Sequence, residues 1–245
     1  MSADTIALVT GANKGIGLAT ARQLAERGLT VLLGARDTEK AASAAKKLAE
    51  EGLSLVPVRI DIADDASVRD AATLVEREYG WLDVLVNNAG MLIRKPAVEV
   101  TADDMRPEFE TNVFGLVRVI HAMLPLLRRS RSARIVNVAS DSAMFAKTTE
   151  PGSMFARSHE SFVYSASKVA VNMLTVKYAN AFRADPELAH IKVNAVTPGY
   201  VATDLNNFNG VRTAEEGARA SVRWATVGDD AETGGFFDDE GRVAW

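Results

Sequence analysis

The chain has 245 residues, of which 47% are hydrophobic, and its formal net charge of −4 at pH 7 argues against a binder of nucleic acid or of anionic membranes. It contains no cysteine, which excludes disulfides, thiolate metal sites and cysteine nucleophiles, and no other metal site is predicted. A signal-peptide pattern and a run of about 18 apolar residues are both missing, so we expect a cytoplasmic protein without membrane spans.

Short apolar runs alternate with amphipathic helical patterns along the chain. In chain order they predict a strand at 5–10, a helix at 15–28, a strand at 29–34, a helix at 38–52, a strand at 53–60, a helix at 64–80, a strand at 82–87, a helix at about 102–128, a strand at 133–139, a helix at 162–184, a strand at 191–196 and a short strand near 235–237. Pro57 indicates that the third strand lies at an edge or is irregular. Apolar strands separated by helices predict an α/β fold, with one doubly wound parallel sheet of about seven strands in a single domain over 1–245.

Two segments, 141–161 and 201–213, show the least regular patterns. Both follow the carboxyl ends of strands, which is where open α/β sheets bind their ligands. The polar stretch 206–219 contains Gly210, and we expect it to be mobile and to close over a ligand.

The stretch TGANKGIG, residues 10–17, lies between the first strand and the first helix. Gly11 permits a tight turn, while Gly15 and Gly17 let the chain approach a ligand closely. A helix start offers free N–H groups that suit a pyrophosphate. The spacing differs from the general G-x-G-x-x-G pattern, and three glycines can also form only a turn. We favour a dinucleotide site, and its predicted residues are Gly11, Asn13, Lys14, Gly15, Ile16 and Gly17.

The end of the second strand bears on the choice of cofactor. Folds that prefer NAD often place an acid there for the ribose hydroxyls, but this chain has Ala35 followed by Arg36. Arg36 and Lys14 together suit a 2′-phosphate, which favours NADPH over NADH. Asp37 argues the other way, and both cations can equally be solvated surface charges.

Tyr164 and Lys168 lie four residues apart at the start of a predicted helix, with only small residues between them. They therefore share one helix face. A free tyrosine has a pKa of about 10, and a neighbouring ammonium lowers it, as a general acid–base requires. The spacing alone is common in proteins and is weak evidence.

Six motifs occur in one order along nearly the whole chain: TGANKGIG (10–17), NNAG (87–90), NVFG (112–115), IVNVAS (135–140), YSASK (164–168) and PGYVATD (198–204). In this order they resemble the short-chain dehydrogenase/reductase family, which implies a Rossmann-type fold. The stretches TGANKGIGLA, ARD and PGYVATDL look most like those of NADPH-dependent carbonyl reductases.

The resemblance implies four catalytic residues. Tyr164 would give a proton to a carbonyl oxygen in reduction and act as the base in the reverse reaction. Lys168 would lower the tyrosine pKa and bind the nicotinamide ribose. Ser140, or Ser142 in its place, would hold the substrate oxygen. Asn112 would interrupt its helix and hold a water in a proton relay to Lys168.

The resemblance also implies the rest of the cofactor site. Asp61 and Ile62 would contact adenine. A second group, Asn88, Ala89 and Gly90, would lie along the adenosine ribose. The nicotinamide end would be held by Pro198, Gly199, Val201 and Thr203.

The chain departs from the family pattern before Tyr164, because Ser140 lies 24 residues upstream and many members have about a dozen. The extra residues include Met144, Phe145, Met154 and Phe155, which would line an apolar substrate pocket. Longer insertions at this place cover the association surface in some monomeric carbonyl reductases. A homo-oligomer and a monomer therefore both stay open.

The sequence as a whole predicts an NADPH-dependent reductase that converts a small-molecule ketone or aldehyde to an alcohol. Two alternatives stay open at this point. One is an NAD(P)-dependent alcohol dehydrogenase that works mainly in oxidation, and the other is a non-catalytic regulator that senses NADP(H). Loss of turnover in Tyr164→Phe with cofactor binding retained would separate an enzyme from a sensor.

Overall fold

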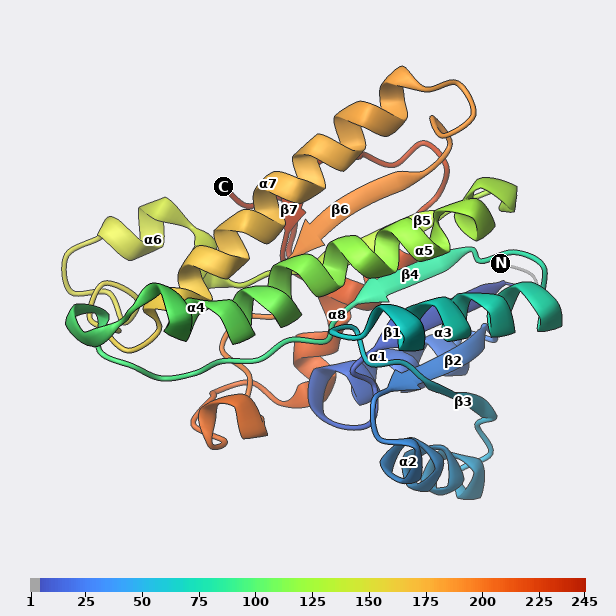
Figure 1. Ribbon diagram of the computed structural model, residues 1–245, viewed down its shortest axis with the longest axis horizontal. Helices are drawn as coiled ribbons and strands as arrows, with labels where there is room; N and C mark the ends of the chain where they lie inside the picture. Colours follow the sequence, from blue (N-terminus) through green and yellow to red (C-terminus); the bar gives the residue numbers. More distant parts are fainter. Residues whose placement is uncertain (1–4) are drawn as a thin grey trace.

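Seven parallel strands form one sheet, in the order β3-β2-β1-β4-β5-β6-β7, in the computed structural model, which describes residues 5–245 (Figure 1). The strands are β1 (Ile6–Thr10), β2 (Thr30–Ala35), β3 (Leu55–Arg59), β4 (Val84–Asn87), β5 (Arg134–Val138), β6 (Lys192–Val196) and β7 (Phe236–Phe237). All seven predicted strands are present. Pro57 lies in β3 at the edge of the sheet, where its missing N–H breaks no central ladder. Residues 1–4 of the predicted domain lie outside the described residues.

Helices cover both faces of the sheet (Figure 1). The longer ones are α1 (Gly15–Glu26), α2 (Thr38–Glu50), α3 (Asp65–Glu78), α4 (Ala102–Phe109), α5 (Gly115–Arg129), α7 (Phe162–Ala184) and α8 (Ala214–Ala225). The shorter ones are η1 (Ala97–Glu99), η2 (Glu110–Phe114), η3 (Asp141–Ala143), α6 (Phe145–Thr149) and η4 (Asp204–Asn206). The sheet and its two helical layers confirm the predicted Rossmann-type, doubly wound fold.

The core consists of two apolar clusters because side chains alternate between the faces of each strand. Leu8 and Leu32 point to one face, with residues of α3, α5 and α7. Val9 and Leu33 point to the other face, with residues of α1, α2 and α8. Buried strands of this kind explain why the strand sequences are almost continuously apolar.

Two helical segments differ from the simple prediction. The predicted helix at 102–128 is interrupted by a single π-helical turn, η2, which contains Asn112, as expected at that residue. The expectation of a mobile polar stretch is wrong for 214–219, because these residues begin α8. A capping box starts that helix: Glu216 N donates to Thr213 Oγ1 at 3.2 Å, and Thr213 N donates to Glu216 Oε2 at 2.9 Å.

The strand order reverses between β1 and β4, so the helices that follow these two strands pack on opposite faces of the sheet, and open α/β sheets bind their ligands at the carboxyl edge of such a point. The glycine-rich loop follows β1, and the NNAG motif follows β4. This edge lies at the left of Figure 1, together with α6 and η4. Among the helices of residues 5–245, none has the length and apolar character needed to cross a membrane.

Candidate active site

The glycine-rich loop forms a cradle that side chains would fill. Gly11 and Gly15 have φ values of +63° and +56°, which favour glycine. A Cβ on Gly17 would lie 2.4 Å from Asn88 Nδ2, so only glycine fits there. The first N–H groups of α1, from Gly15 to Gly17, lack intrahelical partners, as at any helix start. The loop therefore fits the pyrophosphate that the sequence predicts.

Thr10 joins the glycine-rich loop to the NNAG segment, although sequence reasoning gave it no role. It is buried at the end of β1, and its Oγ1 accepts hydrogen bonds from Asn88 N at 3.0 Å and Ala89 N at 3.1 Å. Asn88 Nδ2 donates back to Thr10 O at 2.9 Å and to Gly11 O at 3.2 Å. The Asn88 side chain thus holds the loop in shape. The sequence feature that could have indicated this role is the hydroxyl of Thr10 at the end of an otherwise apolar strand.

The end of β2 fits a 2′-phosphate better than a free ribose hydroxyl. Arg36 is exposed there. Asp37, which the sequence left as a competing ribose ligand, is the N-cap of α2 and accepts from Lys40 N at 3.0 Å. Hydrogen bonds from Lys40 lower the pKa of Asp37, so its carboxylate is engaged with α2.

The segment 201–213, called the flap below, reaches the glycine-rich loop. Lys14 Nζ forms an ion pair with Asp204 Oδ2 at 2.9 Å. A Cβ on Gly15 would lie 3.4 Å from Thr203 Cγ2, so the two segments are in contact range. The ends of the flap are joined by a hydrogen bond from Ala202 N to Arg212 O at 2.9 Å. The predicted pyrophosphate and nicotinamide sites are therefore adjacent.

The remaining predicted cofactor residues differ in how far their side chains are free. Asp61 is half-buried after β3 and accepts from Ala63 N at 3.1 Å. Ile62 is buried in the core, and its side chain packs against Gly115. Val201 is likewise buried against Gly217. Contacts with a cofactor through these two side chains are limited, which leaves their backbone groups for that role.

Gly90, which was predicted to lie along the adenosine ribose, lies at the same edge of the sheet as Pro198 and Gly199, which were predicted to hold the nicotinamide end. A Cβ on Gly90 would lie 3.2 Å from Asn112 Oδ1 and 3.5 Å from Lys168 Nζ, so Gly90 borders two of the predicted catalytic residues. Gly199 has a φ of +74° and follows Pro198 directly after the sixth strand. The structure therefore brings the NNAG and PGYVATD motifs to the same edge of the sheet.

Tyr164 and Lys168 share one face of α7, as their spacing predicts. Lys168 is buried, and its Nζ donates to Val138 O at 2.8 Å, at the end of β5. The same nitrogen lies 5.6 Å from the centroid of the Tyr164 ring. The lysine is therefore fixed by the sheet and held beside the phenol.

The pKa of Tyr164 differs from the expectation that Lys168 lowers it. In the structure it is raised to about 12, because burial disfavours the phenolate. Hydrogen bonding with Ser140 acts in the opposite direction, and the negative charge of Glu108 raises the pKa further. Burial also lowers the pKa of Lys168 to about 8. Tyr164 is thus protonated at neutral pH in this structure.

Ser140 and Ser142 have different places. Ser140 lies close enough to Tyr164 to affect its pKa. Ser142 is buried, and both its N and its Oγ donate to Ser140 Oγ, at 3.2 and 3.0 Å. Ser140 is therefore the serine next to Tyr164, and Ser142 donates to its hydroxyl.

Asn112 joins three segments of the site. Its Oδ1 accepts from Met91 N at 2.8 Å, while its Nδ2 donates to Met91 O at 2.9 Å and to Ser167 Oγ at 3.0 Å. These bonds tie η2 to α7 and to the segment after NNAG. The π-helical turn leaves local backbone groups outside the regular α-helical ladder, as a relay water would require.

Glu108 is a second residue that sequence reasoning missed. It lies on α4 with a fully buried side chain, and its Oε2 accepts from Ile93 N at 3.2 Å. Burial raises its pKa to about 7, and the positive charge of Lys168 partly offsets that effect. The only signal in the sequence was its position four residues before Asn112.

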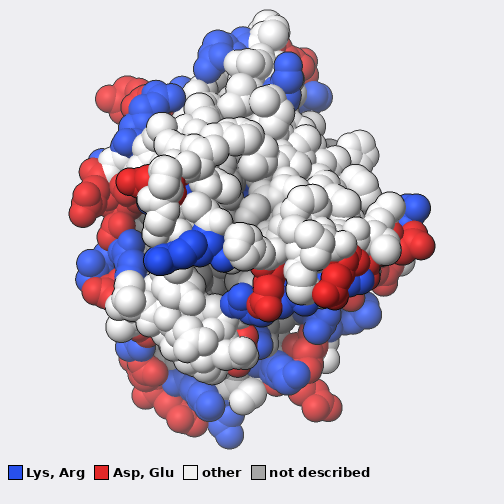
Figure 2. Space-filling view, turned by 90° about the vertical axis from the view of Figure 1, so that its left-hand side faces the viewer, with Lys and Arg blue, Asp and Glu red and all other residues white. Residues whose placement is uncertain are grey.

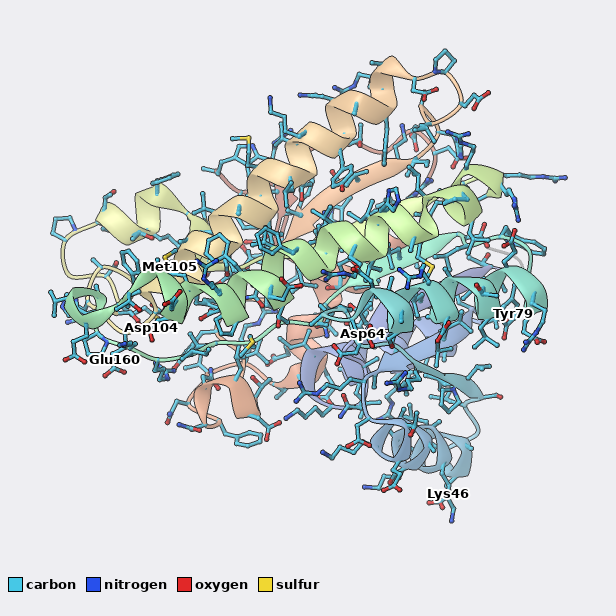
Figure 3. The ribbon with its side chains drawn as sticks, viewed as in Figure 1. Lys46, Asp64, Tyr79, Asp104, Met105 and Glu160 are labelled. Atoms are coloured by element: carbon cyan, nitrogen blue, oxygen red, sulfur yellow. The ribbon has the colours of Figure 1, made fainter. Side chains whose placement is uncertain are left out.

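The insertion 141–161 is attached at both ends. Asp141 Oδ1 accepts from Thr197 Oγ1 at 2.8 Å, and Lys95 N donates to Glu160 O at 3.1 Å. Figure 3 shows Glu160 beside Asp104 and Met105 at the start of α4. The insertion therefore forms one wall at the site end of the molecule.

The apolar residues predicted to line a pocket are not equivalent. Met144 belongs to the core, so its predicted role as a pocket residue is wrong. Phe145 and Met154 are exposed, and Phe155 is half-buried. Figure 2 shows the site end of the molecule, where a broad surface without Lys, Arg, Asp or Glu lies beside a hollow edged by charged residues. Exposed apolar side chains here suit an apolar substrate.

Residues 5–212 match a family model described as short chain dehydrogenase. The chain therefore belongs to the short-chain dehydrogenase family and is an oxidoreductase of that class. The short-chain dehydrogenase anuI of Penicillium roqueforti (strain FM164) is 40% identical to it, over 97% of this chain and 95% of the relative.

The chain is also similar to carbonyl reductases in both sequence and structure. Carbonyl reductase (NADPH) 1 of Bos taurus is 31% identical, over 100% of this chain and 99% of the relative. The crystal structure of NADPH-bound carbonyl reductase from chicken fatty liver superposes with a TM-score of 0.85 at 27% identity, and 100% of each chain is covered.

Proposed function

We propose that the protein is an NADPH-dependent reductase that converts the carbonyl group of a small ketone or aldehyde to an alcohol. The observation that carries the proposal is the convergence of Tyr164, Ser140 and Lys168 at the sheet edge that also carries the glycine-rich loop. Relatives whose names specify NADPH, at 31% identity over the whole chain, support the choice of cofactor.

The cofactor would be held by residues already placed at this edge. The N–H groups from Gly15 to Gly17 would bind the pyrophosphate, and Arg36 and Lys14 the 2′-phosphate. Pro198, Gly199 and Thr203 would hold the nicotinamide end. When bound, NADPH supplies the hydride that the carbonyl carbon accepts.

The chain's own residues would supply the proton and orient the substrate. Ser140 would donate a hydrogen bond to the carbonyl oxygen, because Ser142 already fills its acceptor positions. Tyr164 would transfer its phenolic proton to the same oxygen. Lys168 carries the positive charge that stabilises the phenolate left behind.

Tyr164 has the protonation state from which reduction starts. Reduction needs a protonated phenol, whereas oxidation needs the phenolate as base. A pKa of about 12 leaves the phenol protonated at neutral pH. All four residues of the predicted catalytic set are present, which favours an enzyme over a sensor that lacks turnover.

The proposal is tested by mixing the purified protein with NADPH, or separately NADH, and a panel of ketones, aldehydes and quinones. Absorbance of the reduced nicotinamide is followed. We expect turnover with NADPH that exceeds turnover with NADH. Turnover that prefers NADH would overturn the cofactor assignment, and NADPH binding without turnover on the panel would favour the sensor.

Three further points stay predictions: the single domain over 1–245, the cytoplasmic location and the choice between monomer and homo-oligomer. The choice between monomer and homo-oligomer depends on the surface of α7, where Phe162 and Met173 are exposed. The insertion therefore leaves apolar surface on this helix open for association. Sedimentation equilibrium measures the state directly.

A further inference from the structure

Glu108 has a buried carboxyl oxygen that the fold itself leaves without a partner. Its side chain is 0% exposed, and only Oε2 has a hydrogen-bond donor, the N–H of Ile93 at 3.2 Å. Among residues 5–245, no group hydrogen-bonds to Oε1. A buried carboxyl oxygen without a partner is costly, so its presence needs a reason.

The position of Glu108 connects it to the catalytic residues. It precedes Asn112 by four residues, and both side chains bind the segment that follows NNAG, Glu108 at Ile93 N and Asn112 at Met91 N. Asn112 donates to Ser167 on α7 at 3.0 Å, so its side of the helix faces α7. Asn112 Oδ1 and Lys168 Nζ both border Gly90. A Cβ added to Gly90 would lie 3.2 Å from the first atom and 3.5 Å from the second. Glu108 therefore faces the space that contains the lysine.

Lys168, on the neighbouring helix α7, is the cation whose charge affects the pKa of Glu108. The charge of Glu108 raises the pKa of Lys168, and the charge of Lys168 lowers that of Glu108. Tyr164, also on α7, is the other titratable group that responds to Glu108.

The neighbouring charges have partners of their own. Lys95, in the segment that follows β4, pairs with Asp104 at 2.6 Å. Glu110, two residues along from Glu108, pairs with Arg118 at 2.8 Å. Neither α4 nor the segment after β4 therefore places an unpaired charge against Glu108. The group that these two segments offer to its carboxylate is the N–H of Ile93.

We propose that Glu108 extends the proton path beyond Lys168. During reduction Lys168 passes a proton to Tyr164, and the Glu108 carboxyl group then returns a proton to Lys168. The idea rests on the proposed function and extends it. The family motifs end the proton path at Asn112, whereas this chain has a titratable group one helical turn earlier.

The proton steps balance. The O–H bond of Tyr164 breaks as the alcohol O–H forms. The phenolate regains a proton that leaves the Lys168 ammonium, and the resulting amine takes the proton of the Glu108 carboxyl through an intervening water, because no direct hydrogen bond joins the two groups. The Glu108 carboxylate then regains a proton from water. No group in this path is oxidised or reduced.

A direct test follows the protonation of Glu108 without any cofactor or substrate. Infrared spectra of the free protein are recorded as a function of pH for wild type, Glu108→Gln and the control Glu110→Gln. We expect the carbonyl stretch of a protonated carboxyl to titrate near neutral pH in wild type and the control, and to be lost in Glu108→Gln. A neutral-pH band that persists in Glu108→Gln, or that is missing from wild type, would overturn the proposal.

A kinetic test links this carboxyl to Lys168. In Glu108→Gln we expect kcat with NADPH and a ketone to fall by roughly tenfold or more, with the alkaline limb of the pH profile about one pH unit lower. Glu108→Asp, which keeps a carboxyl, should regain part of kcat. An unchanged kcat and pH profile in Glu108→Gln would overturn the role in the relay.

The two tests separate this inference from the proposed function. If wild type shows no turnover on any carbonyl, the proposed function fails, and the infrared titration still reports whether Glu108 exchanges a proton near neutrality. If wild type turns over and both tests are negative, only the role of Glu108 fails. Thermal unfolding of Glu108→Gln identifies a variant that has not folded, and Glu108→Asp then carries the test.

Discussion

Lys14 of the glycine-rich loop and Asp204 of the flap form an ion pair, with 2.9 Å between Nζ and Oδ2. The same lysine is a predicted ligand of the 2′-phosphate of NADPH. Both side chains are more than half exposed, so the ion pair contributes little stability. Binding of the phosphate and closure of the flap therefore compete for one ammonium group.

This competition predicts that Asp204→Asn binds NADPH more tightly, because the lysine is released from its partner. The gain should be at most about fivefold in Kd, and NADH, which lacks the 2′-phosphate, should show no change. Quenching of protein fluorescence measures both affinities. Asp103→Asn serves as the control, since Asp103 forms an exposed ion pair with Arg106 on α4. Equal gains for NADPH and NADH would contradict the prediction.

Arg36 should determine much of the preference between the two cofactors. It is exposed at the end of β2, and its acidic neighbour Asp37 is engaged in capping α2. Loss of a charge-assisted hydrogen bond costs roughly 1.5–3 kcal/mol, so Arg36→Ala should raise the Kd of NADPH about tenfold or more. The Kd of NADH should change little. Arg69→Ala, an exposed arginine on α3, is the control, and an unchanged NADPH affinity in Arg36→Ala would reject this assignment.

Most of the fold could be predicted from the sequence, and so could the placement of Tyr164 beside Lys168, because both depend on local patterns. Apolar strands and glycine-rich turns determine the sheet, and the spacing of Tyr164 and Lys168 places both on one face of α7. The start of α8 was also readable from Thr213 and Glu216, although it was missed. In these cases neighbours along the chain carry the information.

The features that could not be predicted depend on tertiary packing. The pKa of Tyr164 rises because segments distant in the sequence partly bury the phenol, and no local pattern reports that burial. Met144 lies in the core although its segment looks like a loop. Glu108 is buried only because α4 packs on α7, and most glutamates at helical positions are exposed.

Burial of Glu108 should also make stability depend on pH. Its pKa is raised from 4.5 to about 7 in the folded protein, so folding favours the protonated form. The contribution to stability is fully present below about pH 4.5 and is lost as the pH rises through about 7. Over that interval wild type should lose about 1.4 kcal/mol per pH unit relative to Glu108→Gln.

Urea unfolding of both proteins at several pH values between 4.5 and 8 measures this difference. Glu110→Gln is the control, because Glu110 is partly exposed and paired with Arg118. A difference between wild type and Glu108→Gln that stays constant with pH would show that Glu108 has an ordinary pKa in the folded protein.

The substitution Tyr164→Phe shows whether Tyr164 supplies the proton in a carbonyl reduction. The change removes one hydroxyl and keeps the ring, and Tyr178→Phe on the same helix is the matched control. We measure kcat with NADPH and a ketone reduced by wild type, together with the Kd of NADPH. If Tyr164 is the proton donor, we expect a loss of about a hundredfold or more in kcat for Tyr164→Phe, an unchanged Kd and a control close to wild type. A Tyr164→Phe variant that retains a kcat similar to that of wild type would contradict that role.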